Sequence, residues 1–122
     1  MIKVGLIGLG YIGAIHLDAL FRIEGVRVKA VCDTNQALAN NIAERFNIKH
    51  AYNDYMHIIN DDDIKVVHNC TPNKYHYPIT RKAIEGGKHV LSEKPLAMTL
   101  KEAEELVELA EKKGLVNGVD FC

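Results

Sequence analysis

The sequence predicts an α/β fold with a doubly wound parallel sheet, and two observations support this prediction. Short runs rich in β-branched residues alternate with segments of helical periodicity along the 122 residues. These runs are almost continuously apolar, as expected for strands that are buried on both faces. Strands of this kind, each followed by a helix, form a parallel sheet with helices on both faces.

The composition is that of one ordinary globular domain. The 15 basic residues are balanced by 16 acidic residues, so we expect no nucleic-acid surface and no membrane-binding polybasic segment. No apolar run approaches the roughly 20 residues of a membrane span, and the N-terminus has no signal-peptide pattern. Three widely spaced cysteines favour reduced thiols over disulfides. We therefore expect a soluble cytoplasmic protein.

Glycines and apolar spacing set the expected elements in the first half of the chain. In the second helical segment, for example, the spacing of Leu38, Ile42 and Phe46 places their side chains on one face. The expected elements are strands over Ile2–Ile7, Val26–Cys32 and Ile48–Tyr52, and helices over Tyr11–Ile23, Asn35–Phe46 and Tyr55–Ile59.

The second half supplies three more strands and two helices. The last helix is the best marked, because Thr99 and Glu102 form a capping box and Gly114 ends the helix. Its expected apolar stripe consists of Leu100, Ala103, Leu106, Val107 and Ala110. The other expected elements are strands over Ile64–Cys70, His89–Leu91 and Leu115–Phe121, and a helix over Tyr75–Glu85.

Six such strands are the complement of a dinucleotide-binding Rossmann fold, with strand order 3-2-1-4-5-6. Ligands of this fold bind at the carboxyl ends of the strands. The residues that directly follow each strand are therefore the candidates for function.

The first strand is followed by a G-x-G-x-x-G motif that opens a helix. Gly8 allows the tight turn, Gly10 lets a pyrophosphate approach the backbone, and Gly13 lets the helix pack closely on the sheet. With Tyr11 and Ile12 between them, these residues are the expected phosphate-binding loop. A purely structural turn is the alternative.

The second strand ends at Asp33, which is 20 residues after Gly13. An acid at this place accepts hydrogen bonds from the adenosine ribose and repels a 2′-phosphate. We therefore expect NAD as the cofactor, with NADP less favoured. The alternative is that Asp33 only caps the next helix.

Two further strand ends carry polar residues. Strand four is followed by Thr71, Pro72 and Asn73, with His76 in the first turn of the next helix, and strand five ends in Glu93 and Lys94. The structural alternatives are turn and capping chemistry for Thr71 and Asn73, and an exposed helix-start position for His76. Four polar clusters at one sheet edge favour a binding site over four unrelated loops.

The remaining polar features have structural interpretations. His68 and Asn69 are expected to form an internal pair within a strand. His16 is expected to pack on the first helix, and an orientation toward the cofactor loop is the alternative. The run Asp61–Asp63 lacks Ca²⁺-loop spacing and is expected to be a solvated turn. The histidines lack ligand spacing, so no metal is expected.

The segment "CTPNKYHYPITRKAIEGGKHVLSEKPLAMTLKEAEEL" resembles the signature of the glucose-fructose oxidoreductase / inositol dehydrogenase / rhizopine catabolism (Gfo/Idh/MocA) oxidoreductases. The match extends over essentially the whole chain. It implies an N-terminal NAD(P)-binding domain of an enzyme that oxidises or reduces sugars, cyclitols or related polyols. Members of the family are usually homo-oligomers.

The resemblance also implies roles for individual residues. Lys94 would be the active-site lysine that relays the substrate hydroxyl proton, and His76 is the second candidate catalytic residue. Glu93 would be the neighbour of Lys94 at the cofactor, and Pro95 would shape the turn, often through a cis Lys–Pro bond. The residues that would border the nicotinamide side of the cofactor are Thr71, Pro72, Asn73 and His76.

The chain departs from the family in length, because members carry a second, α/β substrate domain. We expect residues 1–122 to be the cofactor domain alone, without most of the substrate pocket or oligomer interface. Two alternatives stay open: a non-catalytic nucleotide-binding module and a methyltransferase. The complete glycine motif and the Glu93–Lys94–Pro95 strand end argue against the methyltransferase.

Overall fold

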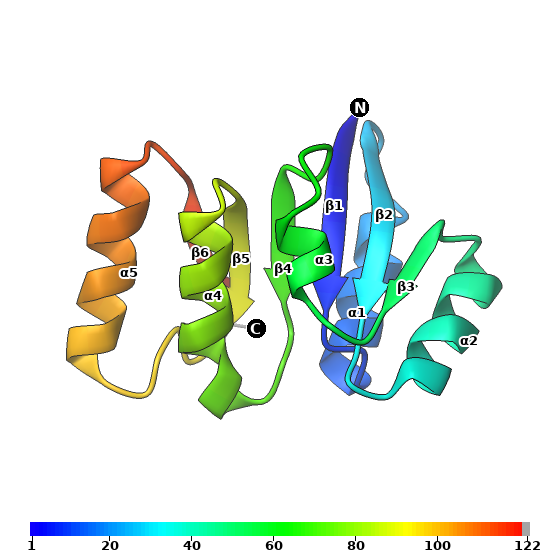
Figure 1. Ribbon diagram of the computed structural model, residues 1–122, viewed down its shortest axis with the longest axis horizontal. Helices are drawn as coiled ribbons and strands as arrows, with labels where there is room; N and C mark the ends of the chain where they lie inside the picture. Colours follow the sequence, from blue (N-terminus) through cyan, green and yellow to red (C-terminus); the bar gives the residue numbers. More distant parts are fainter. Residues whose placement is uncertain (121–122) are drawn as a thin grey trace.

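The computed structural model describes residues 1–120, and its centre is a six-stranded parallel sheet in the order β3-β2-β1-β4-β5-β6 (Figure 1). This class and this strand order are those predicted from the sequence. The strands are β1 (Ile2–Ile7), β2 (Val26–Cys32), β3 (His50–Tyr52), β4 (Val66–Asn69), β5 (His89–Glu93) and β6 (Asn117–Asp120). The helices are α1 (Tyr11–Leu20), α2 (Gln36–Phe46), α3 (Met56–Ile59), α4 (His76–Glu85) and α5 (Leu100–Lys112), with a 3-10 turn η1 (Asn73–Tyr75) before α4.

Helices cover both faces of the sheet, and the side chains of β1 and β2 divide the core between these faces. Leu6 and Val31 pack with residues of α1 and α2, whereas Ile7 and Cys32 pack with residues of α3, α4 and α5. The division follows from strand geometry, because successive side chains point to opposite faces. In Figure 1, α3, α4 and α5 lie on the near face and α1 lies on the far face.

The register of the sheet brings the carboxyl ends of four strands to one edge. Ile7, the last residue of β1, pairs with Cys32 of β2 and with Asn69 of β4. Asn69 in turn pairs with Ser92 of β5. The four loops that follow these strands therefore meet at the same edge.

Most predicted elements are present with shifted ends. Helix α1 ends at Leu20 instead of Ile23, because the chain tightens into a turn before Gly25, whose φ of 84° lets it reverse into β2. Strand β5 is longer than expected and includes Glu93. Strand β6 begins at Asn117, and its predicted end at Phe121 lies outside the described residues. No helix within residues 1–120 is long and apolar enough to cross a membrane.

The apolar stripe of α5 is narrower than predicted. Leu106 and Ala110 are buried as expected, but Leu100 and Val107 are 75% and 45% exposed. Leu109 packs against the core in their place. The reason is the position of α5 at the end of the sheet, where its main contacts are with α4 and β6.

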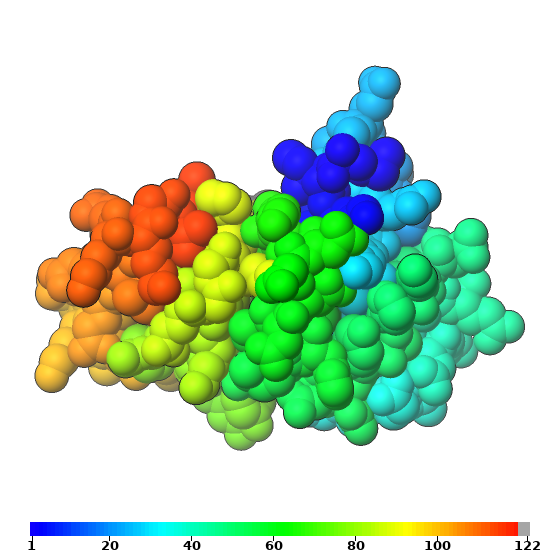
Figure 2. Space-filling view, turned by 45° about the horizontal axis from the view of Figure 1, so that its top comes forward, coloured from blue at the N-terminus to red at the C-terminus, as the bar shows by residue number. Residues whose placement is uncertain are grey.

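The acidic turn before β4 is exposed at Asp62 and Asp63, as expected of a solvated turn, but it also forms specific contacts. Asp61 forms an ion pair with Lys29 at 2.7 Å, and Asp63 forms one with Lys3 at 2.6 Å. The buried Lys88 donates from Nζ to two carbonyl oxygens of the same turn, at 2.6 and 2.7 Å. These contacts attach the turn to Lys3 near the amino end of β1 and to Lys29 in the middle of β2. Figure 2 shows the blue N-terminal segment beside green surface.

Candidate cofactor site

The loops at the carboxyl edge of the sheet enclose a groove of about 590 Å³. Every residue predicted to bind the cofactor lines this groove, except Gly13, which is buried beneath it. The lining comes from the loops after β1, β2, β4 and β5. The groove therefore lies at the edge where open parallel sheets bind their ligands.

The three glycines of the first loop differ in their surroundings. A Cβ atom on Gly8, whose φ is 95°, would lie 2.6 Å from the carbonyl oxygen of Cys70. A Cβ atom on Gly13 would lie 2.0 Å from the carbonyl oxygen of Gly8. Gly8 is therefore required where the first loop meets the backbone after β4, and Gly13 is required where α1 packs on the first loop. Nothing lies within 4 Å of a Cβ position on Gly10, so the space above Gly10 is open to a ligand.

Helix α1 begins beside this open space without a side-chain cap. Its N-cap is Gly10, and the first N–H groups of a helix have no carbonyl partner within it. These N–H groups and the helix dipole favour an anion such as a pyrophosphate. Tyr11 and Ile12, which are 81% and 41% exposed, lie at the same place.

The carboxylate of Asp33 joins two loops of the groove. Its Oδ2 accepts a hydrogen bond from the N–H of Leu9 and its Oδ1 accepts one from the N–H of Asn35, both at 2.9 Å. The cap of α2 is Asn35, whose side chain accepts from the N–H of Leu38 at 3.1 Å. The capping alternative for Asp33 is therefore wrong. Each carboxylate oxygen keeps a second lone pair, which can accept from a ribose hydroxyl.

Asn69 organises the loop after β4. Its buried amide Nδ2 donates to the Oγ1 of Thr80 at 2.9 Å and to the carbonyl oxygen of His76 at 3.1 Å, both in α4. Its Oδ1 accepts from the Oγ1 of Thr71 at 2.6 Å. The expected pairing of Asn69 with His68 is wrong, because neighbouring strand residues point to opposite faces.

His76 is 1% exposed, so the alternative of an exposed helix-start histidine is also wrong. Its Nε2 lies 2.7 Å from the carbonyl oxygen of Thr71, and its Nδ1 contacts the carbonyl oxygen of Pro95. The ring thereby links the loop after β4 to the loop after β5. Because both ring nitrogens face carbonyl oxygens, the geometry favours a role in positioning these loops, and a catalytic role for His76 stays a prediction.

Glu93 and Lys94 both line the groove, but they differ in their contacts. The Oε1 of Glu93 lies 2.6 Å from the Nε2 of His16 in α1, so the carboxylate faces this imidazole. Lys94 is exposed and lines the groove. Within residues 1–120 its side chain makes no ion pair. The peptide bond between Lys94 and Pro95 is cis.

Residues 2–121 match the family model described as an oxidoreductase family with an NAD-binding Rossmann fold (Gfo/Idh/MocA). The chain belongs to this family. As a Gfo/Idh/MocA member it is an NAD(P)-binding domain. Its glycine loop and its cis Lys94–Pro95 bond lie at the positions that the sequence signature implied.

Individual relatives agree with this assignment. The chain is 37% identical to glycosyl hydrolase family 109 protein 1 of Shewanella sp. (strain ANA-3), with 92% of this chain and 26% of the relative aligned. It is 36% identical to inositol 2-dehydrogenase of Salmonella typhimurium strain LT2, with coverages of 93% and 34%. The solved structure of a 3-ketoreductase from Actinomadura kijaniata, in complex with TDP-benzene and NADP, has a TM-score of 0.93 at 31% identity, with coverages of 98% and 38%. The chain thus spans about a third or less of the length of its curated relatives.

From the sequence, a place for His16 near the cofactor loop was only the less favoured alternative, and the place of His68 near the site was not predicted. The Nδ1 of His16 lies 3.0 Å from the Nδ1 of His68, and their rings meet edge to face. The available signal was the position of His16, one helix turn after Gly13 and therefore on the same buried face of α1. In the described part of the chain, no group of three or more His, Cys, Asp or Glu side chains is arranged to hold a metal ion.

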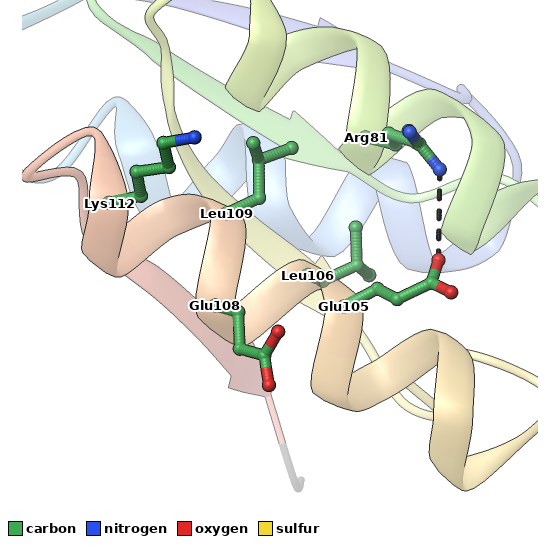
Figure 3. A pocket seen from close by; sticks show the side chains of 6 residues that line it. All are labelled: Arg81, Glu105, Leu106, Glu108, Leu109 and Lys112. Atoms are coloured by element: carbon green, nitrogen blue, oxygen red, sulfur yellow. Dashed lines mark ion pairs between the residues drawn. The ribbon is translucent and has the colours of Figure 1, made fainter.

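A second groove, of about 340 Å³, lies between α4 and α5 (Figure 3). Two of its charged side chains, Arg81 of α4 and Glu105 of α5, form an ion pair at 3.7 Å. The hydroxyl of Tyr77 also donates to Glu105 at 2.6 Å. None of the predicted site residues lines this groove. We interpret the groove as a result of the packing of α4 against α5.

Proposed function

We propose that this chain is the NAD-binding domain of a longer cytoplasmic oxidoreductase, which acts as a homo-oligomer on a sugar, cyclitol or related polyol. One observation carries the proposal: the glycine loop, Asp33 and Lys94 converge on a single groove. The names of two relatives, an inositol 2-dehydrogenase and a 3-ketoreductase, support a hydroxyl or ketone of a polyol or sugar as the reacting group.

In this proposal, each group of residues in the groove has its own role. The N–H groups at the start of α1 bind the pyrophosphate, and Asp33 accepts from the adenosine ribose. When bound, NAD would supply the hydride acceptor for oxidation of a carbinol carbon of the substrate. Lys94 hydrogen-bonds the substrate oxygen and accepts its proton during oxidation. Glu93, Thr71, Pro72, Asn73 and His76 border the nicotinamide end.

The proposed preference for NAD over NADP depends on Asp33. Its carboxylate would repel a 2′-phosphate, and no arginine follows in residues 34–36 to neutralise one. The relative solved with NADP indicates that this preference is a property of individual family members.

A second candidate is cleavage of a glycosidic bond, favoured by the 37% identity to a family 109 glycosyl hydrolase. A third is nucleotide binding without catalysis, in a sensor or regulatory module. All three use the same groove for the nucleotide, so they differ in the reaction that follows binding.

One experiment separates them. The full-length enzyme is incubated with NAD and a panel of inositols, hexoses and their aryl glycosides. Formation of NADH with a polyol supports the proposal. Release of the aryl alcohol without net NADH supports glycoside cleavage. Tight NAD binding with neither product overturns the proposal in favour of the non-catalytic module.

A further inference from the structure

We infer that His16 is a positioning residue that holds the Glu93 carboxylate away from Lys94. Nothing in the sequence motif assigns His16 a role in the reaction. The inference deepens the proposed function and rests on it wherever Lys94 is concerned, whereas the contact between His16 and Glu93 can be tested without it.

The contact has a defined direction. A carboxylate only accepts hydrogen bonds, so the Nε2–H of His16 donates to the Oε1 of Glu93 over their 2.6 Å separation. The Nδ1 of His16 faces the Nδ1 of His68 at 3.0 Å, and one of these two nitrogens donates to the other. The result is a hydrogen-bonded line from Glu93 through His16 to His68, which joins β5, α1 and β4.

Burial strengthens the hydrogen bonds that link Glu93, His16 and His68. The side chain of His16 is 6% exposed and that of Glu93 is 15% exposed. Polar groups with so little access to water depend on protein partners, and their hydrogen bonds are stronger in a medium of low polarity. Glu93 is therefore held on the α1 side of the sheet.

This orientation matters for Lys94, the next residue in the chain. A carboxylate in contact with a lysine stabilises the ammonium form and opposes proton acceptance. Lys94 is exposed at the groove and makes no ion pair within residues 1–120. By occupying the Glu93 carboxylate, His16 leaves the amine of Lys94 able to take a proton from the substrate hydroxyl.

Two substitutions of His16 distinguish the contributions of its two ring nitrogens. In His16→Gln the amide nitrogen lies near the place of Nε2 and can still donate to Glu93. In His16→Asn the shorter amide lies near the place of Nδ1 and cannot reach Glu93. The variant Glu93→Gln removes the charge itself.

The test measures steady-state kinetics against pH in the full-length enzyme. For oxidation of the substrate, His16→Asn should lower kcat by roughly tenfold or more at neutral pH, move the acidic limb of the profile to higher pH, and change KM for NAD little. His16→Gln should recover most of this loss. The double variant His16→Asn/Glu93→Gln should match Glu93→Gln alone, because contacting residues are not additive.

A purely structural role for His16 predicts a different result. The loss would then persist in the double variant and would appear in the melting temperature, without a shift of the pH profile, and this outcome would overturn the inference. Equal activity of all variants would overturn it as well.

The 122-residue chain supplies a readout that does not need turnover. In ¹⁵N-edited NMR spectra, the Nε2 of His16 should carry a hydrogen-bonded proton whose resonance shifts in Glu93→Gln. If no such proton is found, the inference fails whatever the reaction is. If the proton is found but the unaltered enzyme reduces no NAD with any substrate, the proposed function fails and the role toward Lys94 fails with it.

Discussion

The N–H of Leu9, inside the glycine loop, donates a hydrogen bond of 2.9 Å to the Oδ2 of Asp33 at the end of β2. This bond places a carboxylate beside the loop that is proposed to bind the pyrophosphate. The end of the groove that is proposed to bind the adenosine therefore carries a carboxylate, where the additional phosphate of NADP would lie.

Replacing this charge should change the choice of cofactor. In Asp33→Ser, the preference for NAD over NADP should narrow or reverse. The ratio of the two affinities should change by on the order of tenfold, which corresponds to about 1.4 kcal/mol. Titration of the 122-residue chain with both nucleotides measures the ratio. Asp18→Ser, which removes an equal charge from the exposed face of α1, is the control and should leave the ratio unchanged. Tighter binding of NADP to the unaltered chain would contradict the assignment.

Two glycines of the loop should respond oppositely to alanine. Gly13→Ala should lower the free energy of unfolding by about 1–3 kcal/mol, because its Cβ would lie 2.0 Å from the carbonyl oxygen of Gly8. Gly10→Ala should fold normally, since the space around that Cβ is open, but should bind NAD poorly because the methyl group occupies the space of the pyrophosphate. Urea unfolding and NAD titration measure both quantities. Normal NAD binding by Gly10→Ala would remove the pyrophosphate from this loop.

Substitutions of Lys94 and Lys88 should affect different properties, which are catalysis for Lys94 and stability for Lys88. Lys94→Ala in the full-length enzyme should lower kcat by roughly 10²-fold or more, with little change in NAD affinity or melting temperature, because the side chain is exposed. Lys88→Ala should instead lower stability by about 1–3 kcal/mol, because two carbonyl oxygens lose their donor. Steady-state kinetics and thermal melts give the comparison. Near-normal turnover of Lys94→Ala would make the Glu93–Lys94–Pro95 segment an ordinary polar loop.

Acid should weaken the fold through the turn before β4. Burial acts to raise the pKa of Asp61, but hydrogen bonds from Lys29 and the backbone outweigh it and leave the pKa below its ordinary value. The hydrogen bond from Lys3 is the main cause that lowers the pKa of Asp63. Since both folded-state values lie below the unfolded value of 3.8, this stabilisation is present above that pH and is lost as the pH falls through the folded values.

The variant Lys29→Met tests this dependence. It should reduce stability at neutral pH and flatten the decline of the urea midpoint below about pH 4. Lys49→Met, at an exposed position, should keep the slope of the unaltered chain. An equal slope in both variants would show that these ion pairs do not control the acid transition.

Cys32 should be unreactive in the native chain. Burial, assisted by the charges of Asp33 and Asp54, raises its pKa to about 12, and the thiolate is the reactive form of cysteine. Alkylation with iodoacetamide at about pH 8, followed by peptide mass spectrometry, should leave Cys32 unmodified until urea unfolds the chain. Rapid native labelling of Cys32 would contradict its placement in the core.

Local and periodic signals in the sequence determined most of the fold. The glycine motif, the alternation of apolar strands with helices, and the cap at Thr99, whose side chain accepts from the N–H of Glu102, each depend on neighbouring residues. These signals predicted the class, the strand order and the cofactor groove. They also predicted Gly8, Asp33 and Lys94 as lining residues, because each directly follows a strand of a parallel sheet.

Only the tertiary structure decided where the polar side chains point. Glu93 and His16 are far apart in sequence, and so are Lys88 and Asp61, so no local pattern predicted their contacts. The exposure of Leu100 depends on the position of α5 at the end of the sheet, and the burial of His76 depends on a loop that follows another strand. Hydrogen bonds and burial between distant segments are set by how the elements pack, and this packing determines which charge lies beside Lys94.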